Sequence, residues 1–180
     1  MIYMFLAEGF EEIEALGTLD IIRRAGIEIE TVGVGGEFIM GAHSILVNAD
    51  KTISEISEKE CSGVILPGGL PGTTNLEKDE TVIRFVKYAN ENKQLLAAIC
   101  AAPSILGHLG LLDGKRATAY PGYETELKGA KYTGAFAEAD GNVITGKGAG
   151  AVFEFGLLIV KELVGAEISN KLRSQMQCTV

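Results

Sequence analysis

Cys100 stands out as a candidate nucleophile. It follows an apolar run at residues 95–99 and precedes a segment at 101–108 that is rich in helix-forming residues. Pro103 falls in the first turn of this segment, where its missing N–H costs no hydrogen bond. The pattern predicts a sharp strand-to-helix turn, with the sulfur at a helix N-terminus that favours a thiolate. A buried structural cysteine explains the stretch equally well, since free cysteine is among the most buried residue types.

Glu14 is the candidate proton carrier. It belongs to a helix predicted at 11–24 and shares a face with Ile21 and Ala25, which we expect to meet a sheet. Loss of hydration there raises the pKa of a carboxyl group, and a protonated Glu14 can hydrogen-bond a thiolate and move protons during catalysis. Two buried anions side by side are unfavourable, so we expect the pair to share one proton. We interpret Glu11 and Glu12 as ordinary helix-start carboxylates.

Two adjacent glycines are candidate backbone donors. Gly68 and Gly69 follow an apolar run at 63–66, and their N–H groups are unobstructed by side chains. Together with the N–H of Ala101 they form a predicted oxyanion pocket. An ordinary turn is the alternative interpretation of this glycine pair.

The elements that must position these residues alternate along the chain. We predict strands at 2–7, 28–34, 63–66, 95–99, 116–120 and 142–145, helices at 11–24, 79–92, 101–108, 148–163 and 168–177, a turn at 73–76, and a hairpin over 38–47. This alternation predicts an α/β fold, a mostly parallel sheet with helices on both faces. Ligands of such sheets bind outside the carboxyl ends of the strands, where the three candidate positions should converge. Without a linker or repeat, residues 1–180 are predicted to form one domain.

Composition excludes several classes of protein. The 180 residues carry a formal net charge of −8, which argues against nucleic acid or an anionic membrane as partner. No apolar run approaches the length of a membrane span, and the apolar start is a first strand rather than a signal peptide. Three cysteines without metal-ligand spacing indicate free thiols and a cytoplasmic location. The two histidines are not paired at ligand spacing, so we expect no metal site.

The histidines also bear on mechanism, because a cysteine peptidase needs a histidine base beside its thiol. His43 lies in the predicted hairpin turn, and His108 lies two turns beyond Cys100 on the same predicted helix. We expect both at the surface. The glycine-rich loop at 146–150 lacks the spacing of a phosphate-binding motif, and we expect Gly148 and Ala149 to line the rim of the sheet.

Taken together, four segments resemble the ThiJ/PfpI superfamily, and within it the branch of the Parkinson-disease-associated protein deglycase and its bacterial homologues. The segments are AEGFEEIE at 7–14, LPGG at 66–69, AAICAAP at 97–103 and FEF at 153–155. The resemblance covers nearly the whole chain. It implies a flavodoxin-like three-layer sandwich, a homodimer and catalysis without a cofactor. It further implies Cys100 as the reactive thiol, Glu14 as its carboxyl partner, and Gly69 and Ala101 as backbone donors.

Three positions depart from this resemblance. Ala101 stands where the peptidase-like branch has a histidine, and Tyr120 stands where the deglycase branch often has one. His43 stands where some relatives have an arginine. We expect Tyr120 and His43 to line the pocket, and a tyrosine can donate a hydrogen bond to a bound carbonyl.

Three functional hypotheses follow. The first is a glyoxalase-like or deglycase-like enzyme that acts on a small reactive carbonyl such as methylglyoxal. The second is a thiol redox sensor or stress chaperone, since an accessible thiolate oxidises readily. The third is a peptidase or amidase, which the missing histidine base disfavours.

Overall fold

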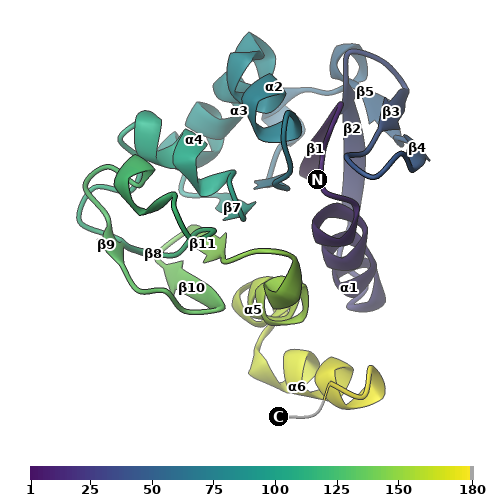
Figure 1. The fold of residues 1–180 in the computed structure, drawn as a ribbon. Coiled ribbons are helices and arrows are strands. Elements are labelled where there is room, and N and C mark those ends of the chain that lie inside the picture. The colour runs from purple at the N-terminus through teal and green to yellow at the C-terminus, as the bar shows by residue number, and fades with distance from the viewer. Residues whose placement is uncertain (179–180) are drawn as a thin grey trace.

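A computed structural model describes residues 1–178 and places a seven-stranded sheet at the centre of the molecule (Figure 1). The strand order is β10-β11-β7-β6-β1-β2-β5. The strands are β1 (Ile2–Ala7), β2 (Ile29–Val34), β5 (Lys51–Thr52), β6 (Gly63–Leu66), β7 (Leu95–Ile99), β10 (Ala137–Asp140) and β11 (Val143–Gly146). The β10–β11 pair is antiparallel and the other neighbouring strands pair in parallel, which confirms the predicted α/β class.

Helices cover both faces of this sheet. They are α1 (Thr18–Arg24), α2 (Gly72–Lys78), α3 (Glu80–Glu91), α4 (Pro103–His108), α5 (Val152–Val164) and α6 (Ala166–Gln175). In Figure 1, α2, α3 and α4 lie on one side of the sheet, α1 and α5 lie on the other, and α6 packs outside α5. In the described part of the chain no helix is long and apolar enough to cross a membrane.

Two short ribbons flank the sheet. The β3 (Phe38–Met40) and β4 (Leu46–Asn48) strands form an antiparallel hairpin, as the sequence predicts. The β8 (Arg116–Ala117) and β9 (Lys131–Tyr132) strands pair in parallel.

Successive side chains of the central strands point to opposite faces of the sheet and belong to two separate hydrophobic clusters. In β1, Tyr3 and Phe5 pack on the α3 side, and both rings meet Phe85 edge-on with centroids 5.7 and 5.6 Å apart. Met4 and Leu6 point to the opposite cluster, which α1 and α5 complete. Burial on both faces explains why the strands carry continuous apolar runs.

The structure corrects four predicted elements: the helices at 11–24 and 148–163, the strand at 116–120 and the turn at 73–76. The helix predicted at 11–24 is divided into a π-helical turn (Ile13–Gly17) and α1, and the helix predicted at 148–163 begins with a 3-10 turn (Ala149–Ala151) before α5. The strand predicted at 116–120 is limited to β8.

The turn predicted at 73–76 belongs to α2. Residues of low helix propensity suggest a turn there, but tertiary packing decides otherwise. The Thr73 N–H donates to the Gly69 carbonyl at 2.8 Å, and Gly72 packs so closely on Phe10 that a Cβ on Gly72 would lie 2.6 Å from the Phe10 nitrogen.

Candidate active site

Cys100 occupies a strained elbow between β7 and α4. Its φ of +65° lies in the left-handed region, which costs free energy for any residue with a Cβ. Two backbone hydrogen bonds hold the elbow: Cys100 N–H donates to the Gly146 carbonyl at 2.9 Å, and Tyr120 N–H donates to the Cys100 carbonyl at 2.9 Å. Neighbouring segments therefore fix the conformation of the cysteine.

Glu14 lies in the π-helical turn that follows β1 and is only 1% exposed. One of its carboxylate oxygens, Oε2, accepts a hydrogen bond from the Gly68 N–H at 3.0 Å. Because β1, β6 and β7 run in parallel, the segments that follow them meet at one edge of the sheet. The structure thus brings together Glu14, Gly68 and Cys100, which are far apart in sequence.

Gly68 leaves no room for a side chain. A Cβ at this position would lie 2.5 Å from Glu14 Oε2 and 2.6 Å from the Cys100 Cβ. This corrects the predicted role of Gly68: its N–H is engaged by Glu14 and is not free to stabilise an oxyanion. Gly68 instead positions the carboxyl group beside the thiol.

The other two predicted donors, Gly69 and Ala101, direct their N–H groups to the Cys100 sulfur. Gly69 has a φ of +91°, and a Cβ there would lie 2.4 Å from the Glu11 nitrogen, so both conformation and space require glycine. Their role as donors to a substrate oxygen stays a prediction.

Burial controls the electrostatics of the pair. It raises the pKa of Glu14 to about 7, opposed by hydrogen bonds with Cys100 and the Gly68 N–H. Burial also raises the pKa of the Cys100 thiol to about 12, with the nearby Glu14 carboxylate as the next cause. Hydrogen bonds from Ala101 and Gly69 act in the opposite direction but are weaker.

The raised thiol pKa corrects the expectation that a helix N-terminus alone would favour the thiolate. The α4 helix has only six residues and begins at Pro103, so its dipole does not outweigh burial beside a carboxylate. Above about pH 7 the pair holds one proton. A thiolate at Cys100 therefore requires that this proton sit on Glu14.

Tyr120 and Gly148 lie beside this pair. A Cβ on Gly148 would lie 3.2 Å from the Tyr120 ring and 4.0 Å from Glu14 Oε1. Tyr120 itself is half exposed. Ala149 follows in the 3-10 turn that leads to α5, and its role as a lining residue stays a prediction.

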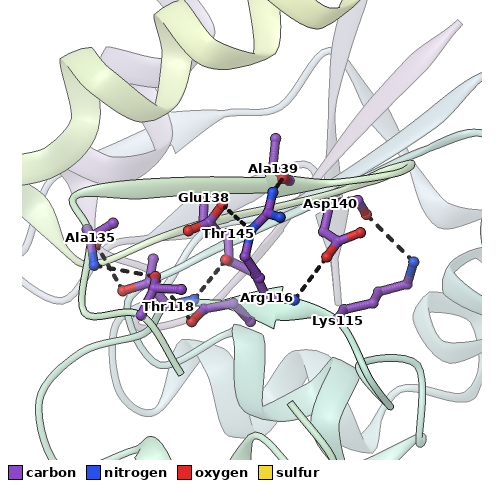
Figure 2. A network of polar contacts seen from close by, with 10 residues as sticks. Lys115, Arg116, Thr118, Ala135, Glu138, Ala139, Asp140 and Thr145 are labelled. Atoms are coloured by element: carbon purple, nitrogen blue, oxygen red, sulfur yellow. Dashed lines mark hydrogen bonds and ion pairs between the residues drawn. The ribbon is translucent and has the colours of Figure 1, made fainter. Parts of the chain in front are cut away.

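A polar network holds the segment that leads to Tyr120 (Figure 2). Arg116 donates from Nε to Glu138 at 3.0 Å, and from its backbone N–H to Asp140 at 2.9 Å. The Thr118 N–H donates to the Thr145 hydroxyl at 2.9 Å. These bonds fasten the segment that precedes Tyr120 to the β10–β11 hairpin.

His43 contacts Glu12, a partner that the sequence did not indicate. Its Nδ1 lies 2.9 Å from Glu12 Oε2, and its backbone N–H donates to Glu12 Oε1 at 2.6 Å. Burial opposes the charge on Glu12, but these bonds lower its pKa overall. Glu12 is thus a buried carboxylate that connects the β3–β4 hairpin to the segment before Glu14, and not an ordinary helix-start carboxylate. A place for His43 in the pocket stays a prediction.

Within residues 1–178, one group of ligand-type atoms lies within 4.8 Å of one another: Glu11, Glu12 and His43. The hydrogen bond between His43 and Glu12 accounts for this arrangement, and we assign no ion to it.

Known proteins share both the sequence pattern and the fold of this chain. The model of the DJ-1/PfpI family matches residues 1–162. This chain belongs to the DJ-1/PfpI family. Its family relatives include the Parkinson disease protein 7 homolog of Danio rerio, which is 35% identical over 178 residues that cover 96% of this chain and 94% of the relative. The glutathione-independent glyoxalase DJR-1.2 of Caenorhabditis elegans is 31% identical, covering 92% of this chain and 89% of the relative.

Solved DJ-1 structures share the fold. A cysteine-to-alanine variant of a DJ-1 superfamily protein from Salmonella typhimurium superposes with a TM-score of 0.92 at 34% identity, covering 98% of this chain and 97% of the other. An oxidized form of Toxoplasma gondii DJ-1 gives a TM-score of 0.93 at 29% identity, with the same coverage.

The raised pKa of Glu14 predicts a pH-dependent gain in stability for Glu14→Gln. The folded chain keeps the Glu14 proton up to about pH 7, whereas a free glutamate loses it near 4.5. The folded state therefore binds more protons in this window, and the free energy of unfolding falls as pH rises through it, by up to about 3 kcal/mol. Urea unfolding at about pH 5 and about pH 8 should show Glu14→Gln gaining on the wild type at the higher pH.

Glu12→Gln is the matched control, because the pKa of Glu12 is lowered and its charge is stabilised by His43. This variant should be less stable than the wild type at about pH 8. If the difference in free energy of unfolding between wild type and Glu14→Gln were the same at both pH values, the assignment of Glu14 as a buried titrating group would be contradicted.

Proposed function

We propose that this chain is a cysteine-dependent, cofactor-independent enzyme of the glyoxalase or deglycase type, acting on small reactive carbonyls such as methylglyoxal. The observation that carries the proposal is the buried Glu14 carboxyl group beside Cys100, a pair that holds one proton above about pH 7. The glyoxalase name of the Caenorhabditis elegans relative supports the same class of reaction.

The first step is addition of the thiolate to the aldehyde carbon of methylglyoxal. The proton on Glu14 passes to the new alkoxide, which gives a hemithioacetal and leaves a carboxylate. N–H groups of Gly69 and Ala101 stabilise the oxygen as its negative charge develops. The carboxylate is then ready to act as a base next to the same carbon.

In the second step Glu14 removes the hydrogen on that carbon as a proton, which forms an enediolate with its charge on the former ketone oxygen. The hydroxyl proton of the hemithioacetal moves to that oxygen, and Glu14 returns its own proton to the neighbouring carbon. The product is a lactoyl thioester on Cys100. Water hydrolyses the thioester to lactate and restores the thiol, so the net reaction adds one water to methylglyoxal. A pKa near 7 suits Glu14 to both roles.

The peptidase hypothesis has less support. Both histidines are held by glutamates: His43 contacts Glu12, and His108 contacts Glu77 and Glu126. Neither imidazole is hydrogen-bonded to the thiol within the part of the chain that the structure describes.

Turnover of methylglyoxal tests the proposal directly. Cys100→Ala and Glu14→Gln should each lower lactate formation by at least about 100-fold, since one removes the nucleophile and the other removes the proton carrier. Cys178→Ser is the control, because this cysteine lies in the C-terminal segment after α6, and its activity should equal the wild type. Undiminished lactate formation by either site variant would refute the mechanism.

A thiol redox sensor is the second candidate, because Cys100 is partly accessible whereas Cys61 is buried. Intact-protein mass spectrometry after mild peroxide treatment counts the oxygen atoms added, and mass spectrometry of the digested protein assigns them to individual cysteines. A sensor should gain two oxygen atoms at Cys100 faster than at any other thiol. Oxidation of Cys100 no faster than that of Cys61 or Cys178 would count against a sensing role.

We also propose that residues 1–180 form one domain that pairs into a homodimer in the cytoplasm. Large apolar side chains are 40–62% exposed on the β3–β4 hairpin and on the turn beside it: Ile13, Phe38, Met40, Ile45 and Leu46. The Gly9 N–H donates to the Met40 carbonyl at 2.8 Å, which joins this patch to the segment leading to Glu14. Contiguous exposed apolar surface is typical of an interface.

Light scattering coupled to size exclusion tests this interface. The wild type should show twice the 19.1 kDa mass of one chain, and Leu46→Glu should shift it to the single-chain mass. Ile168→Glu, at an exposed position on α6, should leave the dimer intact. A monomeric wild type would contradict the proposed dimer.

A further inference from the structure

His108 bridges two carboxylates that belong to other elements. Its Nδ1 lies 2.5 Å from Glu77 Oε1, at the end of α2, and its Nε2 lies 2.8 Å from Glu126 Oε2, in the 3-10 turn Glu124–Glu126. A neutral imidazole carries only one N–H and can donate to only one of them. When both carboxylates are ionised, the two contacts together require the doubly protonated, positively charged ring.

Each of the three elements that His108 connects comes shortly after a residue of the candidate site in the sequence. The α2 helix follows Gly69, and the Thr73 N–H bonds to the Gly69 carbonyl. The α4 helix, which ends at His108, follows Cys100. From Tyr120, successive turns lead to the 3-10 turn, with Tyr123 N–H donating to the Tyr120 carbonyl at 3.0 Å.

Close backbone packing supports the same junction. A Cβ on Gly107 would lie 2.1 Å from the Glu126 carbonyl oxygen and 2.9 Å from the Leu127 Cα. The α4 helix and the 3-10 turn therefore touch directly beside His108. The His108 imidazole adds a polar contact to Glu126 at this junction and also connects α2 to it through Glu77.

We propose that charged His108 is a positioning residue, a clamp that holds the Gly69, Cys100 and Tyr120 segments together and releases them when it loses its proton. The clamp acts on the candidate active site, so its catalytic consequence rests on the proposed function. Its effect on the segments themselves is independent of any turnover.

The charges around the ring support a clamp that opens at a pH above the 6.5 of a free imidazole. Hydrogen bonds to Glu126 and then to Glu77 raise the pKa of His108 above its usual 6.5, while partial burial and Lys128 oppose this. Charged His108 therefore contributes its full stabilisation of the folded chain below pH 6.5. This contribution is lost as the pH rises through the higher pKa that His108 has in the folded chain. His108 lies near the surface, so solvent limits the strength of each contact.

Hydrogen exchange measured by mass spectrometry, without substrate, tests the clamp. At about pH 6, His108→Gln should exchange about two- to five-fold faster than the wild type in segments 72–78 and 121–128, after correction for intrinsic rates. At about pH 9 the two proteins should exchange alike, because the wild-type imidazole is then neutral. His43→Gln should leave both segments unchanged at either pH.

Two outcomes overturn the proposal: equal exchange of wild type and His108→Gln at about pH 6, or a difference between them that is the same at both pH values. The second indicates a role of shape rather than charge. NMR titration of the imidazole gives an independent check, since Glu126→Gln should lower the titration midpoint of His108 and leave that of His43 in place. Failure of the methylglyoxal assay would leave all of these readouts unaffected.

Discussion

The site depends on the burial of two ionisable groups that cannot both be charged near neutral pH. Glu14 is almost completely enclosed, and an anion at Glu14 and a thiolate at Cys100 cannot both form at neutral pH without a large loss of hydration energy. The proton must therefore sit on one group or the other. Its transfer from sulfur to oxygen creates a nucleophile and a proton donor at the same moment.

The fold supplies this arrangement through its parallel strands. The segments after β1, β6 and β7 meet at one edge, and Gly68 lets the carboxyl group and the cysteine approach because it has no side chain. The strained backbone of Cys100 is held by a hydrogen bond that its N–H donates to the Gly146 carbonyl and by one that its carbonyl accepts from the Tyr120 N–H. Such a site costs stability, which the two hydrophobic clusters on either side of the sheet offset.

Local sequence pattern was sufficient for strands β1, β2, β6, β7 and β11 of the sheet and for the convergence of Glu14 with Cys100. Apolar runs identify buried strands, and the carboxyl ends of parallel strands must lie together. The pattern did not reveal the π-helical turn around Glu14, because one extra residue per turn leaves no signature in hydrophobic spacing. It also gave the wrong direction for the Cys100 pKa, since the effect of burial beside a carboxylate depends on three-dimensional distances. The glutamate partners of His43 and His108 lie 18 to 31 residues away along the chain, beyond the reach of any local motif.

The pH dependence of Cys100 alkylation by iodoacetamide tests the shared proton most directly. In the wild type the rate should rise through a midpoint near 7, as the pair loses its first proton, and then level off. In Glu14→Gln this step should be absent, and the rate should rise only at higher pH, where the isolated buried thiol ionises. Identical profiles for the two proteins would contradict the account, because Cys100 would then titrate without reference to Glu14.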